Sequence, residues 1–168
     1  VQNLTFQNQK IHRVRNRELF NPPHCFTAKG LNCSNYKMRS VFSDKQLVCR
    51  ETMYVIKGND SQEDILYNLV GLFNSSFFSY LNLMVGSSLG IEREQRFMTE
   101  VLSFPYTFSK QTADQVRNIQ ELCASDDYLC TVEVDALVKK LDQHVLSEFG
   151  LDHDVFVDYA LRIQIPEL

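Results

Sequence analysis

The spacing of the apolar residues changes near Gly58, and this change constrains the fold more than any other feature of the sequence. Over residues 13–57, short runs alternate polar residues with apolar or β-branched ones, as half-buried strands do, and turn-forming residues separate the runs. After Ser61, apolar residues recur every three or four positions, as in amphipathic helices. The two patterns together predict an α+β fold. We expect a small, curled, mostly antiparallel sheet in the N-terminal third, packed with helices and followed by a helical C-terminal part.

Helix boundaries can be predicted after Gly58. Ser61 is expected to begin the first helix, because Asp64 completes a weak capping box and acidic residues favour the positive helix N-terminus. Further helical stretches are expected over residues 77–85, 111–124, 132–149 and 152–162. The chain has 168 residues, 44% of them hydrophobic, which suffices for one packed domain. We expect residues 1–108 to hold the sheet and a helix pair, and residues 109–168 to form a helical appendix.

The charge of the chain is divided as sharply as its periodicity. Residues 1–57 contain ten Lys or Arg against three Asp or Glu, a formal charge of +7. The remaining residues contain seven basic and eighteen acidic residues, a formal charge of −11. The basic part suits a polyanion such as nucleic acid, and the acidic part does not. The alternative is that Lys and Arg merely guard solvated strand edges.

The basic residues of the predicted strands are the first candidates for contact with a polyanion. Alternation predicts that one face of the sheet is buried and that the other presents basic side chains to solvent, namely Lys29, Lys37, Arg39 and Arg50. We expect Lys37 and Arg39 to make the first contacts. Arg13, Arg15 and Arg17 occupy alternate positions, so they would share one face of an extended strand and could bind a phosphate backbone. An ordinary exposed edge would explain them equally well.

Residues 86–95 (GSSLGIEREQ) form the most unusual segment of the chain. Its two glycines permit close backbone approach, while Ser87, Ser88 and Arg93 supply hydrogen-bond donors for phosphate. The alternative is a turn between two helices whose polar residues only cap them.

The segment Asn21-Pro-Pro-His24 resembles the Asn/Asp-Pro-Pro-Tyr/Phe motif with which amino-methyltransferases hold a flipped base. Here His24 replaces the aromatic residue. Only twenty residues precede the segment, and none forms a glycine-rich cofactor turn. We therefore expect a Pro-Pro turn that leads into a strand.

Other signs of chemistry are absent from the sequence. The four histidines are scattered, no P-loop or nucleophile elbow occurs, and five cysteines form no Cys-x-x-Cys pair. We therefore expect no catalytic residue, no metal site and reduced thiols, which favours the cytoplasm. Four Asn-x-Ser/Thr triplets leave a secreted glycoprotein as an alternative. No membrane span is expected, since polar residues interrupt the most apolar stretch, 66–85.

Several stretches, in this order, resemble one known family. They are residues 23–31 (PHCFTAKGL), 38–44 (MRSVFSD), 51–58 (ETMYVIKG), 66–80 (LYNLVGLFNSSFFSY), 86–95, 101–106 (VLSFPY) and the helical tail 141–166. They are similar to the target-recognition region that follows the catalytic domain in type IIG restriction-methyltransferases and related adenine-specific DNA methylases. A more distant resemblance is to type I specificity subunits. Leu89 departs from the pattern, which has an aromatic residue there.

The resemblance implies a division of labour within a longer protein. A preceding domain would hold S-adenosylmethionine and the true catalytic Pro-Pro motif, whereas this chain would hold no cofactor and catalyse nothing. The chain would bind double-stranded DNA through Arg13, Arg15, Arg17, Lys29, Lys37, Arg39, Ser87, Ser88 and Arg93. Its acidic helices after Gln111 would dock the methyltransferase domain of the same polypeptide. Whether the longer protein also cuts DNA stays open.

Two other functions remain as alternatives at this stage. The first is a protein-interaction module whose helices join subunits and whose basic strands only interact with solvent. The second is a stand-alone hydrolase, which requires a nucleophile, a base and an acid to meet in three dimensions.

Overall fold

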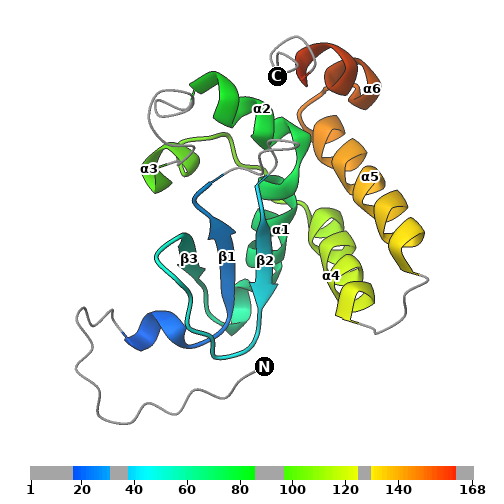
Figure 1. Ribbon diagram of the computed structural model, residues 1–168. Coiled ribbons are helices and arrows are strands. Elements are labelled where there is room, and N and C mark those ends of the chain that lie inside the picture. Colours follow the sequence, from blue (N-terminus) through cyan, green and yellow to red (C-terminus); the bar gives the residue numbers. More distant parts are fainter. Residues whose placement is uncertain (1–16, 31–37, 86–96, 125–129, 162–168) are drawn as a thin grey trace.

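The computed structural model describes residues 17–30, 38–85, 97–124 and 130–161, which form a three-stranded sheet covered by helices (Figure 1). The sheet contains β1 (His24–Ala28), β2 (Ser40–Ser43) and β3 (Met53–Lys57). Strand β1 is central and pairs antiparallel with β2 on one side and β3 on the other. The α+β fold and the antiparallel sheet in the N-terminal third are therefore confirmed.

Helices make up most of the remaining described residues. The longer ones are α1 (Glu63–Asn74), α2 (Ser76–Val85), α4 (Lys110–Ala124) and α5 (Cys130–Glu148). Short ones are η1 (Arg17–Phe20), η2 (Asp60–Gln62), α3 (Met98–Val101), α6 (His153–Val155) and the π-helical turn η3 (Phe156–Leu161). Within these residues, no helix is long and apolar enough to cross a membrane.

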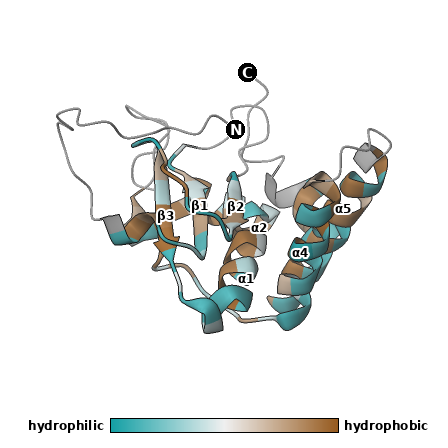
Figure 2. Cartoon of the chain, turned by 90° about the horizontal axis from the view of Figure 1, so that it is seen from below, coloured by the Kyte–Doolittle hydropathy of each residue, from teal (hydrophilic) through white to brown (hydrophobic). Residues whose placement is uncertain are grey.

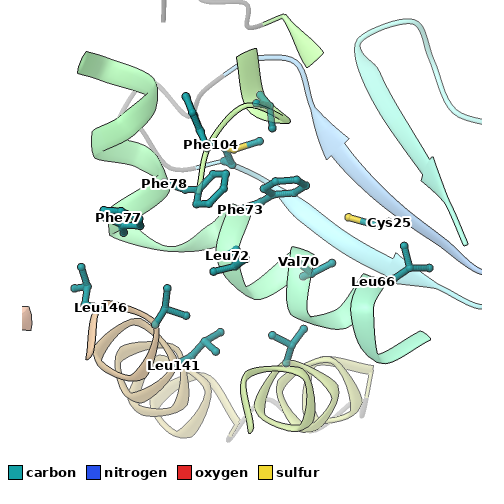
Figure 3. Close-up of a cluster of buried hydrophobic side chains, with 14 of the residues drawn as sticks. Cys25, Leu66, Val70, Leu72, Phe73, Phe77, Phe78, Phe104, Leu141 and Leu146 are labelled. Atoms are coloured by element: carbon teal, nitrogen blue, oxygen red, sulfur yellow. The ribbon is translucent and has the colours of Figure 1, made fainter. Parts of the chain in front are cut away.

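Helix α1 lies between the sheet and the pair formed by α4 and α5 (Figure 1). Figure 3 shows the core around it, with Cys25 contributed by β1 on one side and Leu141 and Leu146 contributed by α5 on the other. Leu72 and Phe73 of α1 are almost completely buried. Each such side chain stabilises the fold by about 1.5–3 kcal/mol relative to an exposed one. One core therefore joins the sheet, α1, α4 and α5.

Gly71 allows α1 and α4 to approach closely. A Cβ atom at this position would lie 2.6 Å from the Thr112 Cγ2 atom and 3.1 Å from the Val116 Cγ2 atom. Both neighbours are themselves buried, so neither can move aside easily. The small residue is thus required by packing between the helices rather than by a turn.

Two side-chain amides occupy the outer edge of β2. The Asn74 amide accepts a hydrogen bond from the Ser40 backbone N–H and donates one to the Ser40 carbonyl, both at 2.9 Å. The Gln120 amide does the same with the N–H and carbonyl of Phe42, at 2.9 and 3.2 Å. These amides replace a fourth strand at alternate residues of β2. They fix the strand against α1 and α4 and block its edge against pairing with another chain.

The expectation that one face of the sheet is exposed is wrong for the central strand. His24, Cys25, Phe26 and Thr27 are all buried, although their side chains alternate between the two faces. Cys25 and Thr27 face α1, whereas His24 lies close to Leu19 of η1. Because β1 is covered on both faces, the open face expected to carry the basic residues does not extend across the central strand.

We predict that Asn74→Ala lowers the free energy of unfolding by about 1–3 kcal/mol, because it leaves the Ser40 backbone groups without their partners. Urea denaturation measures the loss, and the amide hydrogens of β2 should exchange faster. Asn118→Ala is the matched control, since Asn118 is exposed on α4 and alanine favours a helix. Equal losses in both variants would contradict the role given to Asn74.

Candidate nucleic-acid interface

Three basic residues lie at one end of the sheet. The Ala28 N–H donates to the Arg39 carbonyl, and the Lys29 N–H donates to the Thr52 carbonyl, both at 2.9 Å. The Arg50 carbonyl accepts from the Met53 N–H at 3.1 Å, in the turn that leads into β3. The end of β1 and the beginnings of β2 and β3 therefore bring Lys29, Arg39 and Arg50 together. We call this set the sheet-end cations.

The sheet-end cations are available for a ligand. Arg39 and Arg50 are exposed, and Lys29 is partly exposed, with its ammonium 5.0 Å from the centre of the Tyr54 ring. A cation–π contact of this kind holds the lysine without neutralising its charge. Among the described residues, none of the three forms an ion pair with a carboxylate.

The sheet-end cations surround the end of the sheet instead of lying on one face. Tyr54 pairs with Thr27, so the side chains of these two residues lie on the same face of the sheet, the one that faces α1. The Lys29 ammonium contacts the Tyr54 ring and therefore lies on the α1 face as well. Arg39 precedes Ser40 and therefore points to the opposite face, which we call the outer face. Of the residues predicted to bind DNA, Lys29 and Arg39 therefore lie at the same end of the sheet but on opposite faces.

Most of the predicted contact residues belong to parts of the chain that the structure does not describe. Outside the described residues lie Arg13, Arg15, Lys37, Ser87, Ser88 and Arg93. Arg17 is the first residue of η1, and only its backbone position is described. The expectations for these seven residues stay predictions.

The basic residues of the helical part are neutralised, in contrast to the sheet-end cations. Lys110 and Arg117 of α4 each approach an Asp64 carboxylate oxygen to 2.7 Å, and both also contact Asp114. Hydrogen bonds from Lys110 and then Arg117 hold the pKa of the Asp64 carboxyl below its ordinary value. Figure 2 shows hydrophilic residues at the neighbouring ends of α1 and α4. The ion pairs of Lys110 and Arg117 with Asp64 and Asp114 join α1 to α4 and leave the two basic side chains little net charge with which to bind a ligand.

A serine, a histidine and a glutamate meet where α4 begins and α5 ends. The Ser109 hydroxyl and a Glu148 carboxylate oxygen each lie 3.2 Å from the same His144 nitrogen, Nε2. A hydrolytic triad needs the acid and the nucleophile on different nitrogens of the ring. Ser109 instead accepts the Thr112 N–H and caps α4. This group therefore holds two helix ends together and does not support a hydrolase.

A second polar cluster fixes α5 against the start of α2. Asp142, only 5% exposed, accepts hydrogen bonds from the Ser76 backbone N–H, at 2.7 Å, and from the Ser76 hydroxyl. The carboxylate thus caps a helix other than its own, where the helix dipole favours negative charge. The His153 Nε2 atom lies 3.7 Å from Asp142. Ser76 is itself buried, so this cluster offers no accessible nucleophile.

The Asn21-Pro-Pro-His24 segment is a turn that leads into β1, as predicted. His24 is 0% exposed, so its ring cannot stack on a base in this conformation. Burial lowers the pKa of the imidazole, an effect strengthened by the charge of Lys57 and partly offset by the carbonyl groups of Leu19 and Ser43. Neither ring nitrogen has a hydrogen-bond partner of ordinary geometry.

Cys25 and the cavity beside β2 add no further chemistry to the described part of the chain. Burial raises the pKa of the Cys25 thiol to about 12, which keeps it protonated and unreactive. The described part of the chain contains no group of three or more His, Cys, Asp or Glu that could hold a metal ion. A cavity of about 150 Å³ lies between β2, α1, α4 and α5, and mostly apolar side chains line it, including Val116, Ile119 and Leu141.

Sequence reasoning placed Arg50 among the basic residues of a sheet face but did not include it among the residues expected to bind double-stranded DNA. It also missed Tyr54 and the exposed Val41. The signal for Arg50 was its place among the basic residues of the predicted strands, although in the structure it lies in the turn before β3. Nothing local marked Tyr54, because its contact with Lys29 depends on strand pairing.

Comparison with models of known protein families finds no match for this chain, and no curated protein sequence matches it either.

We predict that acid destabilises the protein through His24. Its folded pKa lies below the ordinary value of 6.5, so the unfolded chain takes up a proton first as the pH falls. The free energy of unfolding should therefore decrease as the pH falls below about 6.5 and stop decreasing on this account below the folded pKa. Urea denaturation at a series of pH values measures this. His24→Phe should flatten the dependence of the unfolding free energy on pH between pH 7 and about pH 5, where carboxylates begin to titrate. An unchanged slope would contradict the assignment of this pH dependence to His24.

Proposed function

We propose that this chain is a DNA-binding target-recognition domain of a larger adenine-specific DNA methyltransferase of a restriction-modification or phage-defence system. It would act in the cytoplasm and position duplex DNA while another domain flips and methylates the adenine. S-adenosylmethionine and the catalytic residues would belong to that other domain, with or without an endonuclease activity. The present chain would bind DNA and would catalyse no reaction.

The observation that best supports this proposal is the position of Lys29, Arg39 and Arg50 at one end of the sheet. Within the part of the chain that the structure describes, none of the three forms an ion pair with a carboxylate. DNA binding draws most of its non-specific affinity from such cations, which displace counterions from the phosphates. Cations that salt bridges already neutralise cannot contribute in this way. Lys110 and Arg117 are such residues, and we assign them no role in DNA binding.

The helical part suits a different partner. Acidic residues predominate after residue 57, and DNA would repel them. Exposed apolar side chains occur there as well, among them Phe97, Leu102 and Val132. An acidic surface with exposed apolar residues fits a protein, which supports docking to the methyltransferase domain of the same polypeptide. The same features keep a protein-interaction module without DNA contact as the alternative function.

We predict that the 168-residue chain binds duplex DNA with an affinity that falls steeply as salt is added. The double variant Lys29→Ala/Arg50→Ala should weaken binding to all duplexes alike and lower the slope of log affinity against log salt by about 2, one unit for each lost phosphate contact. Fluorescence anisotropy with a labelled duplex at several salt concentrations measures both quantities.

The double variant Lys139→Ala/Lys140→Ala is the matched control. It also removes two exposed positive charges, but from α5. Its affinity and salt slope should remain close to those of the unchanged chain. If both double variants behave alike, net charge and not the sheet end governs binding. If the unchanged chain binds no duplex at low salt, the interaction module becomes the better explanation.

A further inference from the structure

Val41 of β2 and Arg39, which directly precedes β2, form a short exposed strip on the outer face of the sheet. Ser40 bonds Thr27 through its hydroxyl, and the Phe42 ring stacks on Tyr67 of α1 with ring centres 3.9 Å apart. Because side chains alternate along a strand, Arg39 and Val41 point the other way. Arg39 is exposed, and Val41 is 45% exposed although it is a β-branched apolar residue.

The strip does not extend onto β1. On the outer face the neighbouring strand contributes Phe26, which pairs with Val41 and is only 5% exposed. A ligand that approaches this face near β2 therefore meets a guanidinium and an isopropyl group, two positions apart.

The backbone beneath the strip is held in place. The amides of Asn74 and Gln120 bind the backbone at Ser40 and Phe42, the residues that alternate with Arg39 and Val41. Side chains that read bases must be held rigidly, since a small displacement removes the hydrogen-bond geometry on which discrimination depends. A flexible edge strand would not provide this.

The spacing and chemistry of the strip match base pairs. Residues two apart on a strand are separated by roughly 6.6 Å, and two base-pair steps of B-DNA span about 6.8 Å. Arginine recognises guanine through its O6 and N7 atoms, and an apolar side chain contacts the methyl group of thymine. Lysines that only bind phosphate would need neither the spacing nor the apolar partner.

We infer that Arg39 and Val41 are specificity-determining residues, which read a guanine and a thymine two base pairs apart in the major groove. This inference rests on the proposed function, in which Lys29 and Arg50 bind phosphates. It assigns the base contacts to Val41 of β2 and to Arg39, which precedes this strand.

Selection of duplexes from a pool with randomised base pairs tests the inference, with the full 168-residue chain as the binder. The unchanged chain should select a guanine and, two base pairs away, a thymine. Arg39→Gln should change the guanine preference to adenine, because glutamine pairs with the N6 and N7 atoms of adenine. Val41→Ser should weaken the thymine preference about fourfold, the effect of one methyl group removed from water, and leave the guanine preference unchanged.

Two further measurements separate base reading from other roles. Val41→Thr keeps the β-branch and one methyl group, so it should retain the thymine preference, and circular dichroism checks that all variants fold. If Arg39→Gln instead weakens binding to all duplexes and lowers the salt slope by about 1, Arg39 binds phosphate and the inference fails while the proposed function stands. A binder without sequence preference, or variants that select the original bases, would also overturn it. If the unchanged chain binds no duplex at all, the proposed function fails, and the inference with it.

Discussion

Helix α1 is buried on two sides, and the positions of the sheet, α4 and α5 all follow from this. Leu66 and Val70 belong to the same core as Cys25 of β1 and Leu146 of α5, so the helix packs against the sheet on one side and against α5 on the other. Gly71 is required on the side of α4, because any larger residue would separate the two helices. Without this helix the small sheet would have no second layer to cover it, and three short strands alone are only marginally stable.

The polar contacts are arranged around the same helix. Its last residue, Asn74, holds β2, and the helix that follows at once, α2, begins with the N–H that Asp142 of α5 accepts. Gln120 adds a second attachment of β2 from α4. The sheet edge and the helical part are therefore connected by satisfied hydrogen bonds as well as by the apolar core. This combination specifies one arrangement, because an incorrect one would leave buried polar groups unpaired.

Basic side chains form ion pairs in the helical part of the molecule but not at the end of the sheet, among the described residues. In the helical part, Lys110 and Arg117 are paired with Asp64 and Asp114 and join α1 to α4. At the end of the sheet, Lys29 contacts an aromatic ring, and Arg39 is exposed. Ion pairs at a surface contribute little to stability, but they remove charge from any ligand. The division of roles proposed for the two parts follows from this difference in pairing.

The sequence by itself determined the α+β class, the antiparallel strands and the approximate helix limits, because periodicity and turn residues are local properties. It also located the basic third of the chain and the turn before β1. The tertiary structure alone decided that β1 is buried on both faces, that Arg50 joins Lys29 and Arg39, and that Val41 stays exposed. It likewise decided that amides 34 and 78 residues away complete the edge of β2. Such contacts join residues that are distant along the chain, so no local pattern contains them, and only the packing around α1 brings them together.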